Sequence, residues 1–200
     1  MTQEDIAKRD EPTLPITNDL DGGRILQEAL MHFQNGRLSE AEGLYQQALA
    51  QQPNHPHALY GLGLLRYQNG QVVQAIALLE KAIASKPDFV EACNNLANMY
   101  AELGQWGKAV TKYLLAIKLM PEFAEAHYNL GAIYQAQNRM EEAKRHFQQT
   151  LICKPDLAAA RESLGEVLRF IARTVAAKQV EANVSTATLV QTSIDFYDQM

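Results

Sequence analysis

Apolar residues recur along most of the chain at the three- and four-residue spacing that is typical of amphipathic helices. In the stretch 91–103, for example, Leu96, Met99, Tyr100 and Leu103 would lie on one face of a helix. A second stretch of the same kind, 106–119, follows after a short gap that contains Gly104. The pattern therefore predicts an all-α chain whose helices are joined in pairs by tight turns.

These helix pairs repeat with a period of 34 residues, and six rows of residues share that period. Three rows contain proline or alanine: Pro53, Pro87, Pro121 and Pro155; Ala41, Ala75, Ala109 and Ala143; Ala48, Ala82 and Ala116, with Thr150 in the fourth copy. The other rows contain small, turn-forming or bulky residues: Ala29, Gly63, Ala97, Gly131 and Gly165; Gly36, Gly70, Gly104 and Asn138; Tyr45, Leu79, Tyr113 and Phe147. Six rows in one register indicate an array of structural repeats.

Each row has a physical explanation. A glycine such as Gly104 suits the left-handed residue that closes a helix, and Asn138 can adopt the same conformation. Proline disfavours helical geometry in the residue before it, so Pro121 is expected to end the second helix of its pair. The small residues let the two helices of a pair approach closely. One such pair cannot bury its apolar face alone, whereas stacked copies can, so we expect a solenoid.

The repeat divides the chain into a series of segments. We expect a flexible lead at 1–21, four helical hairpins at 22–55, 56–89, 90–123 and 124–157, and a capping helix at 158–180. Ala172 stands where the earlier copies have a turn residue, so the capping helix is expected to continue past that point. The tail at 181–200 contains a possible short helix, 186–199.

Composition and charge narrow the class of protein. The net charge is −5 and the pI about 5.5, and an acidic chain repels a phosphate backbone, which argues against nucleic acid as a partner. No apolar run is long enough for a membrane span, and the polar N-terminus does not resemble a secretory signal. The two cysteines, Cys93 and Cys153, are far apart in sequence and favour a reduced, cytoplasmic protein.

The rows resemble those of the tetratricopeptide-repeat (TPR) family over about 22–170. The third copy matches the family's pattern at Ala97, Tyr100, Ala109, Tyr113, Ala116 and Pro121. The third and fourth copies are similar to bacterial TPR arrays and to the TPR region of O-linked N-acetylglucosamine transferase. The first copy departs from the pattern, with Glu28 at a leucine position and His32 at a tyrosine position. A pentatricopeptide array, which binds RNA, fits less well because its period is longer and its groove is usually basic.

The resemblance implies a right-handed α-solenoid of four TPR hairpins plus a C-terminal capping helix. It also implies that the first helix of each hairpin lines a concave groove that binds a protein or peptide. The peptide-binding candidates on these helices are Tyr60, Tyr67, Asn94, Asn95, Asn98, Tyr128, Asn129 and Gln135. Asn95 and Asn129 stand one repeat apart, and a carboxamide can pair with peptide main-chain groups without reading their sequence. Packing against a neighbouring helix is the alternative explanation for Tyr60 and Tyr128.

Several kinds of chemistry lack support in the sequence. The first helices at 91–103 and 125–137 contain no Lys or Arg, so a clamp for acidic chaperone tails is not expected. Glu91, Glu102 and Glu125 would favour a neutral or basic ligand in the groove. His55 and His57 are the only neighbouring histidines, and they have too few companions for a metal site. We therefore expect no catalytic residues, no metal and no cofactor.

Three functions remain open at this level. The sequence favours a cytoplasmic, non-enzymatic scaffold that binds an extended peptide or helix of a partner, without nucleic acid and without membrane insertion. A second interpretation is the N-terminal recognition arm of a larger glycosyl-, methyl- or sulfotransferase. The third is a self-associating assembly factor, because the poorly matching first repeat could leave an apolar end exposed.

Overall fold

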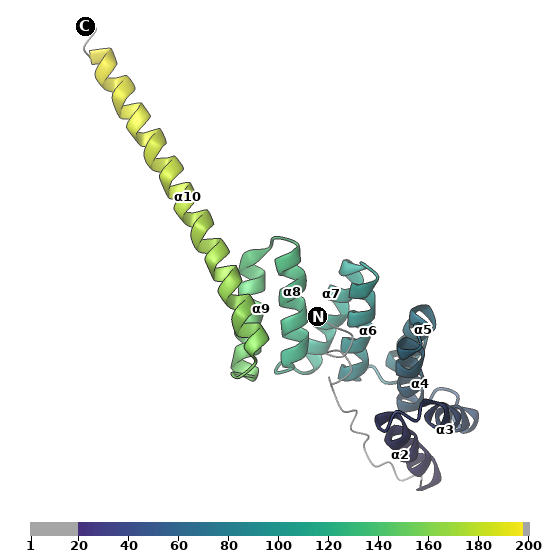
Figure 1. Ribbon diagram of the computed structural model, residues 1–200. Coiled ribbons are helices and arrows are strands. Elements are labelled where there is room, and N and C mark those ends of the chain that lie inside the picture. The colour runs from purple at the N-terminus through teal and green to yellow at the C-terminus, as the bar shows by residue number, and fades with distance from the viewer. Residues whose placement is uncertain (1–19, 198–200) are drawn as a thin grey trace. The chain divides into compact units, whose positions relative to one another are not determined.

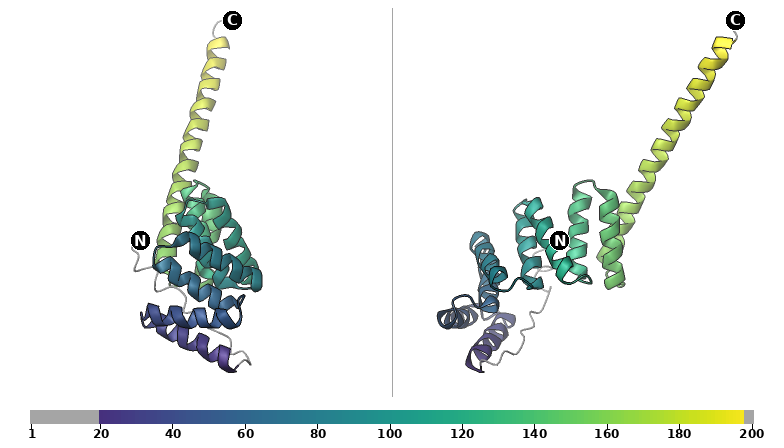
Figure 2. Two further views of the ribbon diagram at one scale, coloured as in Figure 1. Left: turned by 90° about the vertical axis from the view of Figure 1, so that its right-hand side faces the viewer. Right: turned by 180° about the vertical axis from the view of Figure 1, so that it is seen from behind.

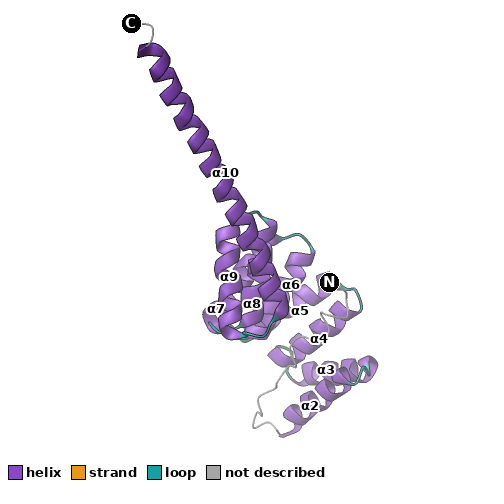
Figure 3. Cartoon of the chain, turned by 60° about the vertical axis from the view of Figure 1, so that its left-hand side comes forward, coloured by secondary structure: helices purple, strands orange, loops and turns teal. Residues whose placement is uncertain are grey.

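A computed structural model describes the backbone of residues 20–197 and the side chains of residues 22–180, and within these ranges all regular structure is helical (Figures 1 and 3). Most of the lead expected at 1–21 and the last residues of the tail lie outside the described residues. The helices are α2 (Leu20–Gln34), α3 (Leu38–Gln51), α4 (Pro56–Gln68), α5 (Val72–Ser85), α6 (Val90–Glu102), α7 (Trp106–Leu119), α8 (Ala124–Ala136), α9 (Met140–Cys153) and α10 (Ala158–Tyr197). The all-α prediction is confirmed for this part of the chain.

The chain divides into two compact units. Unit 1 comprises residues 1–121 and contains α2 to α7. Within it α2 packs on α3, α4 on α5 and α6 on α7, and further contacts join α3 to α4 and α5 to α6. Unit 2 comprises residues 122–200, and in it α9 packs on both α8 and α10.

The turn inside each helix pair is built around one left-handed residue. Gly36, Gly70, Gly104 and Asn138 have φ angles of 72°, 75°, 69° and 60°. The residue after each turn donates its N–H to a carbonyl near the end of the first helix, as Gln105 does to Tyr100 at 2.8 Å. This hydrogen bond closes the helix end in the manner of a Schellman motif. The sequence prediction for the turn row, including its asparagine, is confirmed.

Replacement of Gly104 by alanine is expected to lower the free energy of unfolding by about 1 kcal/mol, because an alanine at a φ of 69° brings its Cβ against the next carbonyl. Asn138→Gly is expected to act in the opposite direction, by a few tenths of a kcal/mol, because glycine tolerates that angle better. Urea unfolding followed by circular dichroism measures both changes. Equal effects of the two substitutions would contradict this explanation of the turns.

The alanine and bulky rows form the interiors of the helix pairs. Ala41, Ala75, Ala109 and Ala143 are all fully buried, and the larger side chains beside them are buried too: Tyr45, Leu79, Tyr113 and Phe147. Thr150, which interrupts the second alanine row, is also buried, and its hydroxyl donates to the carbonyl of His146 at 2.9 Å. The polar hydroxyl is therefore accommodated by its own helix, which explains how threonine replaces alanine there.

Helix α10 differs from the helix expected at its position. The sequence predicts a helix that ends near 180, followed by a separate tail, but α10 continues without a break to Tyr197. No glycine or proline occurs between Glu166 and Tyr197, so nothing in the sequence stops the helix. Its first part packs on α9 and α8, while its later part extends away from both (Figure 2). Despite its length, neither α10 nor any other helix in the described residues is apolar enough to cross a membrane.

Candidate functional site

In unit 1, two hydrogen bonds link side chains of α4 and α6, which are the first helices of successive pairs. The amide nitrogen of Asn95 on α6 donates to the hydroxyl of Tyr60 on α4 at 2.6 Å. Further along the same helices, the hydroxyl of Tyr67 donates to the carboxylate of Glu102. Burial, followed by the effect of Glu102, raises the pKa of the Tyr67 hydroxyl, so this tyrosine stays a donor at any physiological pH. Two pairs of polar side chains, Tyr60 with Asn95 and Tyr67 with Glu102, thus link adjacent repeats.

Side chains of the second helices α5 and α7 also form hydrogen bonds with α6. Tyr113 on α7 donates its hydroxyl to the side-chain oxygen of Asn98, and Tyr100 on α6 donates to Glu80 on α5 at 2.5 Å. Burial and the Glu80 carboxylate raise the pKa of Tyr100 to about 12. Because several of these partners are half-buried, the hydrogen bonds fix the side-chain directions on α6 before any ligand arrives.

The predicted residues of unit 1 differ in exposure. Tyr60 and Asn94 are buried, with 3% and 0% of their surface exposed. The Tyr60 ring packs 4.9 Å from the ring of Phe89, which is the packing alternative considered for it. Tyr67, Asn95 and Asn98 are only half-buried and remain reachable. A role for any of them in binding a ligand stays a prediction.

Asn95 retains bonding capacity after its link to Tyr60. A carboxamide has two N–H donors and a carbonyl with two lone pairs, and the Tyr60 bond uses one donor. The Asn95 carbonyl has no hydrogen-bond partner among the described residues. It is therefore suited to accept an N–H from a peptide main chain while Tyr60 holds the side chain in place.

In unit 2, the three predicted residues all lie on α8. Tyr128 is half-buried, with its ring 5.7 Å from that of Phe147 on α9, and Asn129 is half-buried one residue later. Gln135, near the C-terminal end of α8, donates its amide to the carboxylate of Glu166 on α10 at 3.1 Å. The contact between Gln135 and α10 was not predicted, since the sequence gives no spacing that joins the two helices.

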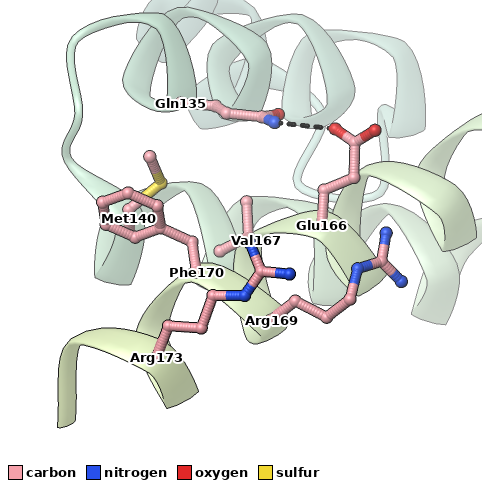
Figure 4. A pocket seen from close by; sticks show the side chains of 7 residues that line it. All are labelled: Gln135, Met140, Glu166, Val167, Arg169, Phe170 and Arg173. Atoms are coloured by element: carbon pink, nitrogen blue, oxygen red, sulfur yellow. Dashed lines mark hydrogen bonds between the residues drawn. The ribbon is translucent and has the colours of Figure 1, made fainter. Parts of the chain in front are cut away.

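A hollow of about 280 Å³ opens beside this contact (Figure 4). It is lined by one residue of α8, one of α9 and five of α10: Gln135, Met140, Glu166, Val167, Arg169, Phe170 and Arg173. Sequence reasoning missed the five residues of α10 because it treated that helix as a cap. These five side chains recur at three- and four-residue spacing, which places them on one face of α10. That spacing is the sequence signal that could have revealed them.

A stack of rings in unit 2 was also not predicted. The Nδ1 atoms of His127 on α8 and His146 on α9 lie 3.1 Å apart, and the His146 ring stacks on Tyr134 with centroids 5.5 Å apart. The guanidinium of Arg139 lies 4.3 Å from the centroid of the Tyr134 ring. Burial, followed by the charges of His127 and Arg145, lowers the pKa of His146 to about 4. The two histidines are 19 residues apart in sequence, so only the packing of α8 on α9 brings them together.

Comparison with protein families decides the class of protein. Models described as tetratricopeptide or TPR repeats match residues 26–88, 66–111, 97–138 and 124–157. Together these matches run without a gap over more than half of the chain. The chain belongs to the tetratricopeptide-repeat family. The resemblance stated from the repeat rows is therefore confirmed, and proteins of this family are in general non-catalytic scaffolds.

Solved TPR structures share this fold at low sequence identity. MamA is 24% identical, with a TM-score of 0.65, over 72% of this chain and 84% of that chain. The pilF protein of Pseudomonas aeruginosa is 22% identical, with a TM-score of 0.71, over 80% of this chain and 73% of that chain. The first TPR of Spaghetti (RPAP3), bound to the HSP90 peptide SRMEEVD, is 24% identical, with a TM-score of 0.56, over 58% of this chain and 93% of that chain. No curated protein sequence matches the chain.

Within the described residues, no three His, Cys, Asp or Glu side chains gather as metal ligands would. His57 is buried against Phe89, with ring centroids 4.7 Å apart, and His55 caps α4 by accepting the N–H of Ala58 at 3.4 Å. The two histidines of this turn are thus explained by packing and helix capping.

Proposed function

We propose that this TPR protein is a protein-interaction scaffold that binds an extended peptide segment of a partner along its first helices. The observation that carries the proposal is the arrangement of Asn95, which Tyr60 holds by one hydrogen bond while its carbonyl stays available. Peptide main-chain N–H groups are the general partners of such a carbonyl. Asn129 occupies the same repeat position on α8, and we expect it to make a separate contact with a peptide within unit 2.

The proposal includes the finer architecture. The helix pairs α2/α3, α4/α5, α6/α7 and α8/α9 would be four TPR hairpins of a right-handed α-solenoid, with the start of α10 as its cap. Contacts within these pairs and the unbroken run of family matches support this view. That one similar structure is a TPR with a bound peptide also supports a peptide as the ligand.

The side chains along α6 shape the expected ligand. Tyr67 and Glu102 form a polar pair on the exposed side, and the Tyr67 hydroxyl already satisfies part of the Glu102 carboxylate. A ligand that passes this pair would meet hydrogen-bonding groups and one partly neutralised acid. Neutral or weakly basic peptide segments suit such a surface better than strongly acidic ones.

The carboxamides are expected to matter for affinity. Peptides selected from a phage-displayed random library on the whole chain should bind about five-fold more weakly to Asn95→Ala or Asn129→Ala, because each change removes about one net hydrogen bond. Fluorescence anisotropy with the selected peptides measures the change in Kd. Circular dichroism would check that both variants keep their helices.

Two controls make this result specific. Tyr60→Phe removes the hydroxyl that holds Asn95 but keeps the carboxamide, so a smaller loss is expected than for Asn95→Ala. Asn54→Ala combined with Gln148→Ala removes exposed carboxamides outside the first helices, one in each unit, and should leave Kd unchanged. If the selected peptides bind all variants equally, the ligand does not use these asparagines and the proposal fails.

A further inference from the structure

The hollow between α8, α9 and α10 combines an apolar floor with a polar rim. Val167 on its floor is 1% exposed, whereas Phe170 beside it is 43% exposed and can make contact with a ligand. Met140 completes the apolar lining and can adapt its shape to a neighbour. A volume of about 280 Å³ is slightly below that of typical small-molecule pockets, so the hollow suits one bulky side chain better than a whole metabolite.

The rim carries two guanidinium groups without partners. Arg169 and Arg173 stand four residues apart on α10, which places them on the same face of the helix. No ion pair or hydrogen bond joins either guanidinium to any residue in the described part of the chain. Three other arginines do have partners: Arg66 contacts Glu42 at 2.5 Å, Arg139 contacts Glu142 at 2.7 Å, and Arg161 donates to the carbonyl of Pro155 at 2.9 Å.

The one acid on the rim is already engaged. Glu166 accepts the amide of Gln135, and Figure 4 shows these two side chains pointing toward each other above α10. Its charge leaves the rim with a net charge of about +1, from two arginines and one glutamate. A carboxylate can accept charge-assisted hydrogen bonds from both guanidinium groups, which makes an acidic side chain a suitable partner for this rim.

We propose that this hollow binds a bulky aliphatic side chain of a partner peptide, with an adjacent carboxylate of the same peptide paired to Arg169 and Arg173. The apolar side chain packs against Met140 and Phe170 above the buried Val167, and the carboxylate accepts hydrogen bonds from the guanidinium groups on the rim. The inference rests on the proposed function, because it names a chemical class of peptide that the scaffold recognises. It adds an acidic anchor at α10 to the neutral or weakly basic preference expected along α6.

The test uses the whole chain, labelled with nitrogen-15, and the capped peptide Gly-Glu-Leu-Glu-Gly as the probe. Proton–nitrogen spectra at millimolar peptide should show shifts of the backbone amides from Glu166 to Arg173 and of the arginine Nε–H groups. The double variant Arg169→Gln/Arg173→Gln should bind about ten-fold more weakly, through loss of both charge-assisted contacts. Lys154→Gln/Lys178→Gln removes the same two charges from exposed positions of unit 2 outside the hollow and should leave Kd unchanged.

Matched peptides identify which chemical groups of the ligand the hollow recognises. Gly-Gln-Leu-Gln-Gly and Gly-Glu-Ser-Glu-Gly should both bind more weakly, since one lacks the carboxylates and the other the aliphatic side chain. Equal binding of either peptide, or tighter binding of a phosphoserine version, would overturn the proposal. So would shifts at the hollow when the protein alone is concentrated, because the occupant would then be a second copy of the chain.

The same spectra separate this inference from the proposed function. Shifts confined to residues 60–67 and 94–98 would overturn the hollow as a binding site while they support peptide binding along the first helices. Shifts at the hollow that survive in Asn95→Ala and Asn129→Ala would support the hollow. The proposed function is then judged by its own library-selected peptides.

Discussion

Gly61→Ala is expected to lower the free energy of unfolding of unit 1 by about 2–3 kcal/mol, although alanine has a higher helix propensity than glycine. A Cβ at this position of α4 would lie 2.3 Å from Cζ of Tyr45, and 2.5 and 2.7 Å from two further atoms of that ring. The ring is buried, with 3% of its surface exposed, so it cannot move aside without disturbing its neighbours. Overpacking of this kind costs about 1–3 kcal/mol or more and outweighs the helix propensity that alanine gains.

Two other helical glycines provide matched controls of opposite sign. At Gly43 on α3 and Gly107 on α7, a Cβ would have no atom within 4 Å, so alanine there meets open space. Gly43→Ala and Gly107→Ala are expected to raise the free energy of unfolding by about 0.5–1 kcal/mol each, from helix propensity alone. Urea unfolding of the three variants measures all three changes. A stabilising Gly61→Ala would show that the Tyr45 ring can relax and that this contact is not restrictive.

A second-site change tests whether Tyr45 is the cause. In the Gly61→Ala background, Tyr45→Leu shortens the side chain that the new methyl group would strike. The double variant should be less destabilised than the sum of the two single variants, by about 1 kcal/mol, because residues in contact do not behave additively. Additive effects would place the strain elsewhere around Gly61.

This contact also explains why the second copy of the repeat has no asparagine at the position of Asn95 and Asn129. Gly61 occupies in the second copy the position that Asn95 and Asn129 occupy in the third and fourth. The sequence alone shows the gap but not its cause. Because the Tyr45 ring of α3 lies directly against Gly61, a side chain does not fit at that position without displacing the ring.

The features that follow from local chemistry were predictable. The left-handed residues at Gly104 and Asn138 and the helix pairs around them depend on turn chemistry and period, which a sequence carries directly. The buried alanine row followed for the same reason, because helices that approach closely require small residues at their contact.

The features that depend on contacts between helices were not predictable. The burial of Tyr60 depends on Phe89, which belongs to another segment of the repeat, and the Gln135–Glu166 contact depends on where α10 lies on α8. The extent of α10 was missed for a different reason. A polar, weakly patterned sequence can continue as a helix when no residue stops it, and periodicity gives little signal in that case.

Acidification from pH 7 to pH 5 is expected to destabilise each unit by about 1–2 kcal/mol through one histidine. Burial, followed by the charges of Lys86 and His55, lowers the pKa of His57 to about 4, and His146 in unit 2 is lowered to about 4 in the same way. An unfolded histidine has a pKa near 6.5, so between pH 6.5 and pH 4 the unfolded state binds more protons than the folded state. Stability is therefore lost as the pH falls through that window, and it is fully present above about pH 7.

Substitution isolates this contribution from that of the carboxylates, which titrate over part of the same range. For His146 the opposing influence is Glu142, which raises the pKa, while burial, His127 and Arg145 lower it, so the net direction rests mainly on burial. In His57→Gln and His146→Gln the difference in unfolding free energy between pH 7 and pH 5 should shrink by about 1–2 kcal/mol in the unit that carries the change. Urea unfolding at the two pH values, read by tyrosine and tryptophan fluorescence, measures this difference for each variant. An unchanged difference in both variants would mean that these rings accept a proton in the folded state, and that their packing against Phe89 and Tyr134 does not exclude the imidazolium form.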